Sequence, residues 1–326
     1  MLWKLATVAC VSTLLARAQP DGPAAPLNKN PRTPRRHVSM ENCTFPYDQI
    51  PYKADTSPSN FRGPQAGYNQ CNDTTAGPES MCQTIIVNSI EDFCFYAPNK
   101  PNAIGSAEHD VVAWCTKPTH GARLIPEGTL TGIQFLRAPS YVAITGFFTG
   151  NYENINIVKG DAGGELDSGG QDLRGNPIGG LAYSENLPST PGAMTQSRIW
   201  HEFIGADGFC LCRHQLDTIG CGPNVRGTYR DNIFLSCESE DQGPVVRGVY
   251  DAPKSSQCTT YTSSAIYAVS TSTSATATPT DASGGSSTSS GGSKPSQATA
   301  GDANMRVQIP FAALAVITLF FGAVFA

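Results

Sequence analysis

The amino-acid sequence predicts a mainly β protein: a disulfide-rich β-sandwich or barrel with little helix, flanked by a disordered N-terminal segment and a Ser/Thr-rich stalk. Short runs of β-branched and aromatic residues alternate with Gly, Pro and Asn. The chain contains 32 Gly and 24 Pro, which favour turns over long helices. Ten cysteines lie in the part expected to fold, a density typical of disulfide-linked extracellular domains.

Five runs carry the strand pattern, each rich in Val, Ile, Phe, Tyr or Trp and bounded by turn-forming residues. They span residues 84–90, 111–115, 131–136, 141–147 and 154–158. A helix is expected only over residues 210–219, where Leu211, Gln215, Leu216 and Ile219 could share one face.

The N-terminus has the pattern of a secretory signal. Lys4 precedes an apolar stretch, and Ala16 and Ala18 are small residues at the two positions that a signal peptidase must admit. We therefore expect residues 1–18 to be a signal peptide. Residues 19–36 lack apolar periodicity and are expected to be disordered, and they end in a dibasic pair that makes this segment a candidate pro-region. The expected ectodomain then covers residues 37–258.

The C-terminal part predicts a stalk and a lipid anchor. Residues 259–300 include 22 Ser or Thr among 42 residues, a composition that cannot bury a core and is typical of O-glycosylated stalks. An apolar tail, 309–326, follows a short polar spacer and the small residues around Gly301, which is the pattern of GPI transfer. We expect a stalk over 259–301, lipid attachment at Gly301 and removal of 302–326. A membrane-spanning tail is the alternative.

Charge and cysteine content narrow the class of protein further. The net charge is −5, with no basic patch, so we expect no nucleic-acid partner. Of eleven cysteines, Cys10 lies in the signal, and the even remainder predicts five disulfides whose connectivity the sequence leaves open. These cysteines form two groups of five, so at least one bridge must join the groups if all are paired. They are Cys43, Cys71, Cys82, Cys94, Cys115, Cys210, Cys212, Cys221, Cys237 and Cys258.

Two N-glycosylation sequons occur near the start of the ectodomain. Asn42 begins Asn-Cys-Thr, and Asn72 begins Asn-Asp-Thr. Both predict glycan attachment on the exposed surface, although early pairing of Cys43 would hinder the use of Asn42.

A glycine-rich segment, residues 159–180, contains four acids, Asp161, Glu165, Asp167 and Asp172. Their carboxylates could bind Ca²⁺, with glycines letting the backbone fold around the ion, but the spacing does not match an EF-hand. Consecutive solvated turns between strands are the simpler interpretation. Glu165 and Asp167 could alternatively serve as the two carboxylates of a glycosidase. Neither a serine-protease triad nor a Gly-x-Ser-x-Gly motif is present.

Histidine suggests one metal-dependent alternative. Cleavage after the dibasic pair would free the amine of His37, and an amine with two imidazoles can bind copper, as in polysaccharide mono-oxygenases. The candidate partners are His109, His120, His201 and His214. Histidines without a metal are far commoner, so no cofactor and no resident metal are expected.

Several blocks of the chain resemble the fungal macrophage-activating glycoproteins, which include immunoreactive cell-surface mannoproteins. The most specific are residues 112–118 (Val-Ala-Trp-Cys-Thr-Lys-Pro), 121–126 (Gly-Ala-Arg-Leu-Ile-Pro) and 159–167 in the glycine-rich segment. Further matching blocks are 92–94, 174–180, 220–221 and 248–250. The resemblance implies a heavily mannosylated, often GPI-anchored protein seen by host lectin receptors through its glycans, and it implies no catalytic residues.

These observations predict a GPI-anchored cell-surface mannoprotein of the plasma membrane and cell wall, with a structural or interaction role. The alternative is a module that binds cell-wall polysaccharide through exposed aromatic residues. Tyr141, Phe147, Phe148 and Tyr152 are the sequence candidates for such a face, although core packing explains them equally well. A copper-dependent polysaccharide oxygenase that uses His37 is the remaining alternative.

Overall fold

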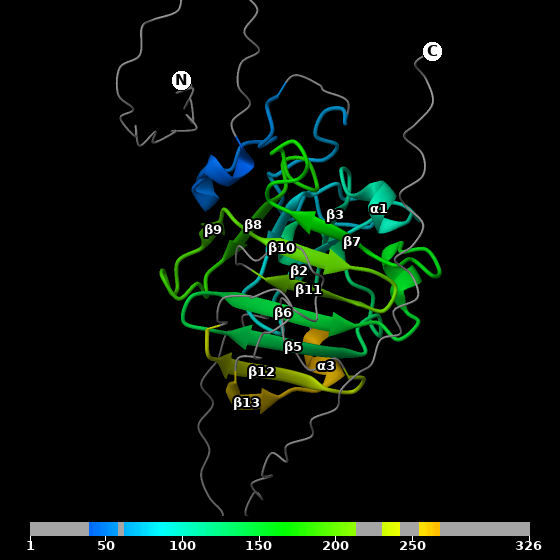
Figure 1. Ribbon diagram of the computed structural model, residues 1–326, viewed down its shortest axis with the longest axis vertical. Helices are drawn as coiled ribbons and strands as arrows, with labels where there is room; N and C mark the ends of the chain where they lie inside the picture. The colour runs from blue at the N-terminus through cyan, green and yellow to red at the C-terminus, as the bar shows by residue number, and fades with distance from the viewer. Residues whose placement is uncertain (1–38, 58–61, 213–229, 242–253, 268–326) are drawn as a thin grey trace, which may run out of the picture. The chain divides into compact units, whose positions relative to one another are not determined.

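The computed structural model describes residues 39–57, 62–212, 230–241 and 254–267, and it has the predicted mainly β fold with little helix (Figure 1). Three sheets form within these residues. Their strands are β1 Thr84–Ile86, β2 Cys94–Ala97, β3 Val112–Cys115, β4 Arg123–Leu124, β5 Gly132–Arg137, β6 Val142–Phe147, β7 Gly164–Asp167, β8 Leu181–Ser184, β9 Thr195–Ser197, β10 His201–Ile204, β11 Gly208–Cys212, β12 Phe234–Ser239 and β13 Ser255–Thr260. The helical pieces are η1 Met40–Asn42, η2 Tyr47–Gln49, α1 Ile104–Ala107, η3 Pro118–His120, η4 Tyr152–Ile155 and α3 Ser263–Tyr267.

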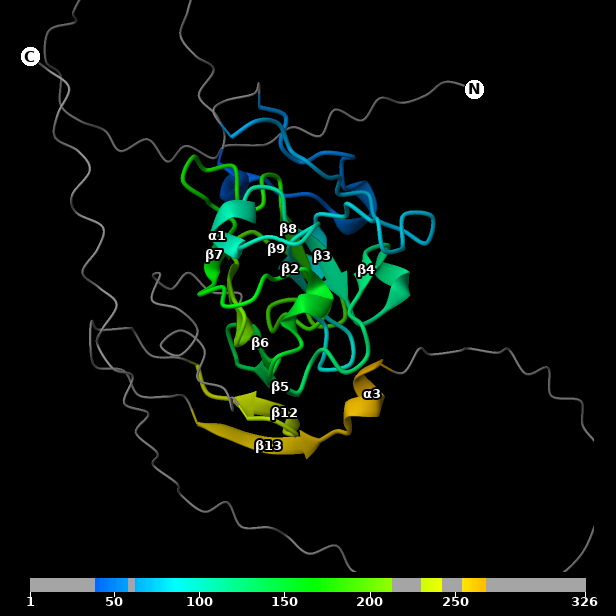
Figure 2. The same cartoon turned by 90° about the vertical axis from the view of Figure 1, so that its right-hand side faces the viewer.

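The largest sheet has seven strands in the order β13-β12-β5-β6-β11-β10-β7, which Figure 1 shows running from bottom to top. Neighbouring strands are antiparallel except β5 and β12, which are parallel. The two smaller sheets have the orders β1-β8-β9 and β2-β3-β4. The N-terminal segment that carries η1 and η2 lies at the end of the domain opposite β12 and β13 (Figures 1 and 2).

Aromatic side chains fill the core between the large sheet and the smaller ones. The ring of Phe209, on β11, lies 4.7 Å from that of Phe95, on β2, and 5.9 Å from that of Phe148, measured between centroids. Gly146 of β6 makes this packing possible, because a Cβ there would come 2.1 Å from the Phe209 ring. Strands β1, β2, β3 and β8 are buried along their whole length, as expected for strands covered on both faces.

Disulfides join neighbouring segments of this fold. Cys94 and Cys115 face each other across β2 and β3, Cys237 and Cys258 join β12 to β13, and Cys71 bonds to Cys82 just before β1. Each of these three bridges joins two cysteines of the same group of five: two bridges in the first group and one in the second. Cys43 and Cys210 are disulfide-bonded as well. Cys221 lies outside the described residues.

Four of the five predicted strands are confirmed as β1, β3, β5 and β6. The fifth, 154–158, is wrong: residues 152–155 form the 3₁₀ helix η4, which ends at Asn156 with a left-handed φ of 66°. Asparagine tolerates this conformation, whereas a strand does not permit it. The predicted turns of the glycine-rich segment are also incomplete, because 164–167 form β7 and pair with β10.

The helix predicted over residues 210–219 is wrong for its first three residues. Cys210, Leu211 and Cys212 end β11, a strand between β6 and β10 that is buried from Phe209 onward. A short run of buried residues cannot be assigned to helix or strand by periodicity. Residues 213–219 lie outside the described part of the chain.

Ordered structure continues past Cys258. Strand β13 runs to Thr260, and α3 follows, with Ile266 fully buried and the Tyr267 hydroxyl accepting a hydrogen bond from the Leu130 backbone N–H at 2.9 Å. The first residues of the segment with stalk-like composition therefore pack on the domain.

A buried carboxyl connects the large sheet to β2. Glu202 of β10 is fully buried, and its two carboxyl oxygens accept from the backbone N–H of Tyr96 at 3.1 and 3.0 Å. Burial raises the pKa of Glu202 well above its usual value, and the Tyr96 hydrogen bond offsets this only in part. The folded state therefore favours the protonated carboxyl.

We expect Glu202→Gln to weaken the pH dependence of stability. Because folding raises the pKa of Glu202, the unfolded chain loses this proton first, and the free energy of unfolding falls as the pH rises from the ordinary value of 4.5 toward neutrality. Thermal unfolding of the variant across this range should show a smaller decline than wild type. The exposed Glu153→Gln is the matched control and should keep the wild-type slope. An unchanged slope in Glu202→Gln would contradict the expectation.

Candidate functional site

The four acids of the glycine-rich segment contact protein donors. Asp161 accepts from the backbone N–H of Ile104 at 3.2 Å, and Asp167 accepts from that of Gly169 at 2.6 Å. Asp172 pairs with arginine, and Glu165 faces His201. Among the residues that the structure describes, no group of three His, Cys, Asp or Glu side chains could hold a metal ion.

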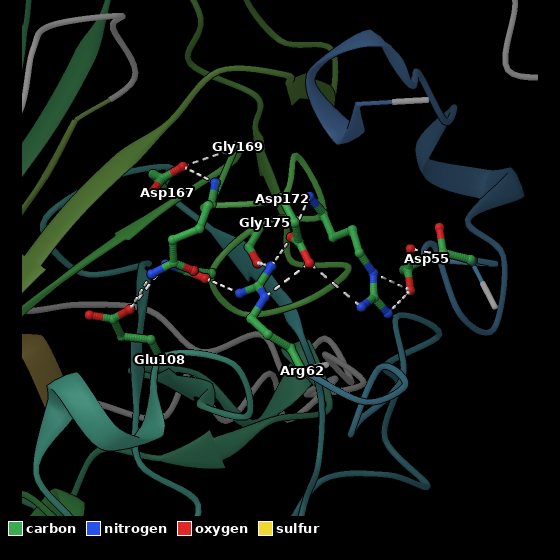
Figure 3. A network of polar contacts seen from close by, with 12 residues as sticks. Asp55, Arg62, Glu108, Asp167, Gly169, Asp172 and Gly175 are labelled. Atoms are coloured by element: carbon green, nitrogen blue, oxygen red, sulfur yellow. Dashed lines mark hydrogen bonds and ion pairs between the residues drawn. The ribbon is translucent and has the colours of Figure 1, made fainter. Parts of the chain in front are cut away.

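Two arginines tie this segment to the N-terminal part of the domain (Figure 3). Arg174 is 0% exposed, and its guanidinium donates to the carboxylate of Asp55 at 2.6 and 3.2 Å. Arg62 donates to the carboxylate of Asp172 and, at 3.1 Å, to the carbonyl of Gly175. Asp55 and Arg62 are therefore both linked to residues 172–175.

A second acidic group lies around the edge strand β7. Burial and the neighbouring Asp167 raise the pKa values of Glu165 and Glu108. His201 lies opposite Asp167 in the β7–β10 pairing, and burial lowers its pKa. Its Nε2 is 3.3 Å from a carboxylate oxygen of Glu165, without the alignment of a hydrogen bond. Several titratable side chains thus lie together at this sheet edge. The surface hollows described next are lined by other residues.

Two hollows lie on a surface built from residues 47–52 and 68–80, which we call the tyrosine surface after Tyr47, Tyr52 and Tyr68. The first hollow encloses about 290 Å³, and its lining includes Tyr47, Asp48, Gln70, Asn72, Thr84 and His120. The second encloses about 380 Å³, and its lining includes Tyr52, Tyr68, Thr74, Thr75, Glu79 and Ser80. Residues 69–72 line the first hollow, and residues 68, 74 and 75 line the second. We call this segment, residues 68–75, the ridge.

The tyrosines of this surface are held by other aromatic rings. Tyr47 is 40% exposed and packs edge-on against the buried ring of Tyr183, with centroids 5.2 Å apart. Tyr52 is 58% exposed and stacks on Tyr68, with centroids 5.7 Å apart. Both exposed rings thus have one face or edge supported by the protein and another in solvent.

Asn69 anchors the backbone of the tyrosine surface and lines the first hollow. Its side chain is buried, donating to the carbonyls of Gln83 and Gly179 at 2.9 Å and accepting from the backbone N–H of Ala54 at 2.8 Å. Its own backbone N–H donates to the carbonyl of Tyr52 at 2.8 Å. One buried amide therefore fixes the spacing between the two segments of the tyrosine surface.

His120, which lines the first hollow, pairs with an aspartate. His120 contacts the carboxylate of Asp92 through Nε2. Burial alone would raise the pKa of Asp92, but the hydrogen bond and charge of His120 lower it below its usual value. Burial and the charge of Asp92 raise the pKa of Tyr47, which stays a neutral hydroxyl. The lining of the first hollow therefore offers hydrogen-bonding groups of several kinds to a polar ligand.

Gly121 allows the loop after His120 to meet the ridge. Its φ is +65°, and a Cβ would lie 2.1 Å from the backbone N of Asn72. No other residue type fits both the conformation and the close approach.

Of the four aromatic residues that the sequence suggested for a binding face, two are buried in the core and two are half-buried. Tyr141 is 5% exposed and Phe148 0% exposed, because both pack in the core, while Phe147 and Tyr152 are half-buried. Sequence reasoning missed Tyr47, Tyr52 and Tyr68, which lie in irregular segments without strand alternation. Their one sequence signal is the polar, proline-containing context around Pro46 and Pro51.

The remaining sequence candidates are distributed as follows. Asn42 and Asn72, the two sequon asparagines, are exposed. His37 and His214 lie outside the described residues, as do the signal, the candidate lipid site Gly301 and the C-terminal tail. Within the described ranges, no helix is long and apolar enough to cross a bilayer.

Together these features define a disulfide-linked, mainly β domain with a polar, tyrosine-lined surface. No family model and no solved structure matches the chain. It is 36% identical over 297 residues to the appressorium protein ROW1 of the fungus Mycosarcoma maydis, covering 77% of this chain and 70% of that relative. It is 35% identical over 253 residues to the appressorium protein ROW2 of the same organism, covering 68% of this chain and 84% of that relative. The chain belongs to the family of these fungal appressorium proteins.

We expect either single change at the buried pair, Arg174→Met or Asp55→Leu, to lower the free energy of unfolding by about 3–5 kcal/mol, because the remaining charge would stay buried without its partner. The double variant should lose less than the sum of the two. Denaturant unfolding of the purified protein measures all three.

The surface pair Arg137–Glu238 is the matched control, with side chains 54% and 45% exposed. Arg137→Met should cost less than about 1 kcal/mol. Losses of that small size in both single variants of the buried pair would show that Arg174 and Asp55 do not anchor the glycine-rich segment.

Proposed function

We propose that this protein is a fungal cell-surface glycoprotein whose β domain is displayed outside the cell and binds wall polysaccharide at the tyrosine surface. The signal pattern, the Ser/Thr-rich stalk and the GPI-type tail around Gly301 support display on the outer face of the plasma membrane and in the wall. The disulfides support an oxidising compartment. Membership of the ROW1 and ROW2 family extends the proposal to a place on the appressorium.

Glycosylation is the second part of this proposal. The resemblance to immunoreactive mannoproteins and the exposed sequons Asn42 and Asn72 support mannose-rich glycans that host lectin receptors can bind. The stalk would add O-linked glycans and hold the domain away from the membrane. This part concerns the glycans and does not depend on the tyrosine surface.

Treating intact cells with phosphatidylinositol-specific phospholipase C should release the protein. The reason is that the proposed lipid at Gly301 is its sole membrane attachment once residues 302–326 are removed. Mass spectrometry of the released protein should find a glycolipid remnant near Gly301, hexose on Ser/Thr peptides and an N-terminus beyond Ala18. Retention in the membrane with Ala326 still attached would refute the lipid anchor.

The exposed tyrosines beside polar hollows carry the proposal of carbohydrate binding. Four large hydrophobic side chains are exposed among the described residues, and two of them are Tyr47 and Tyr52. A sugar ring has apolar C–H faces and a rim of hydroxyls, so it matches an aromatic ring flanked by amide, carboxylate and imidazole groups. Gln70, Asn72 and His120 supply such groups in the first hollow, and Glu79 and Ser80 supply them in the second.

The ridge makes the two hollows suited to a polysaccharide rather than to a single sugar. Each hollow presents one exposed tyrosine, and different residues of the same segment, 68–75, line the two hollows. A linear polysaccharide that crosses the ridge would meet both rings, and two weak contacts on one ligand reinforce each other. We therefore assign binding of extended wall polysaccharide, such as β-glucan or chitin, and not a chemical reaction.

Replacing either exposed ring, by Tyr47→Ala or Tyr52→Ala, should weaken binding to insoluble wall polysaccharide about fivefold, since each stacking contact contributes about 1 kcal/mol. The double variant should lose measurable binding. Depletion isotherms on β-glucan and on chitin measure the affinity.

Leu124→Ala is the matched control, because Leu124 is 44% exposed and is not part of the tyrosine surface. Thermal unfolding verifies that all variants are folded. Wild-type binding that survives in the double tyrosine variant would place the polysaccharide site elsewhere, and no binding by wild type to either polymer would refute this part of the proposal.

A further inference from the structure

The ridge of the tyrosine surface carries a glycosylation sequon whose asparagine is a wall of the first hollow. Asn72 lines that hollow together with Tyr47 and His120, whereas Thr74 of the same sequon lines the second. Asn72 is exposed. A sugar bonded to its Nδ2 would therefore start inside the lining of the first hollow.

The asparagine is held in an orientation suited to glycan attachment. Its Oδ1 accepts from the backbone N–H of Thr74 at 2.9 Å and from the Thr74 hydroxyl at 2.6 Å. This turn fixes the amide plane and leaves Nδ2, the atom that carries an N-linked sugar, directed away from these contacts. The hydroxyl required by the sequon thus also positions the acceptor.

The backbone around Asn72 cannot swing the glycan away. The Asn72 N–H donates to the Thr75 hydroxyl at 2.9 Å, and the Asn72 carbonyl accepts from the Thr75 N–H at 2.8 Å. The Thr75 hydroxyl also donates to the carbonyl of Gly121 at 2.8 Å, and Cys71 is bonded to Cys82. The attachment point is therefore fixed relative to the rings and walls of the hollow.

From this geometry we propose that the N-glycan on Asn72 lies over the first hollow against Tyr47 and controls access of polysaccharide to it. A tethered sugar has an effective concentration of the order of millimolar, so even a weak contact with the hollow is competitive. The unglycosylated form would expose the whole tyrosine surface, and the glycosylated form would offer mainly the second hollow. The ligand class rests on the proposed function, but the covering of Tyr47 does not.

The Asn42 sequon provides a matched comparison. Asn42 is also exposed, but it lies in η1 and is not part of the lining found for either hollow. A glycan there adds similar mass and charge to the protein without starting at the tyrosine surface. An effect that follows loss of the Asn72 glycan but not loss of the Asn42 glycan is therefore due to the position of Asn72.

The experiment compares secreted wild type with Asn72→Asp and Asn42→Asp. Aspartate keeps the acceptor oxygen that bonds Thr74 but carries no glycan. Peptide mass spectrometry gives the occupancy of each sequon, tetranitromethane labelling gives the nitration rates of Tyr47 and Tyr52, and depletion isotherms give polysaccharide affinity. Enzymatic removal of N-glycans from the folded wild-type protein yields the same aspartate and excludes a folding defect.

We expect Asn72→Asp and the deglycosylated protein to nitrate Tyr47 faster than wild type, with the Tyr52 rate unchanged, and to bind polysaccharide about three- to tenfold more tightly. Asn42→Asp should match wild type in all readouts. An unoccupied Asn72, or equal Tyr47 nitration in wild type and Asn72→Asp, would overturn the inference. Faster Tyr47 nitration without polysaccharide binding by any form would uphold the covering and refute the proposed ligand.

Discussion

The buried ion pair between Arg174 and Asp55 is the contact on which the N-terminal half of the domain depends. Arg174 is fully buried, so its charge is tolerated only because Asp55 and the carbonyl of Gly63 accept its hydrogen bonds. The pair joins the glycine-rich segment to a stretch of chain that has almost no regular structure. Arg62 makes a second link in the same direction, to Asp172 (Figure 3).

The shape of the tyrosine surface depends on this connection. Its two segments are irregular, and side-chain hydrogen bonds rather than a strand ladder set their spacing, with Asn69 bonded to three different backbone groups. Such a site is sensitive to single polar residues, because each buried amide that loses a partner destabilises the fold. Loops on a rigid scaffold are also where binding residues concentrate in proteins. The sheets thus give stability, and the polar network places the rings.

The proposed display, glycosylation and carbohydrate binding would fit together in one surface protein. ROW1 and ROW2, the relatives of this chain, are named as appressorium proteins. A domain that carries glycans and also binds polysaccharide could connect wall polymers or bind its own glycans. The sequon on the ridge would join these two proposed properties at one position, because Asn72, the proposed attachment site, also lines the first hollow.

The local sequence pattern determined the fold class and four of the strands. β-Branched and aromatic residues in β5 and β6 and flanking turn residues carry that information within a few positions. Local patterns failed at β11, where a short buried run fits helix and strand equally, and at residues 154–158, where Asn156 ends a 3₁₀ turn. Long-range packing decided the site: Tyr141 and Phe148 are covered by the core, while Tyr47 and Tyr52 are exposed because Asn69 and Arg174 join segments far apart in the chain. Whether a side chain is exposed depends on which sheets and segments pack together. No local pattern in an irregular segment contains that information.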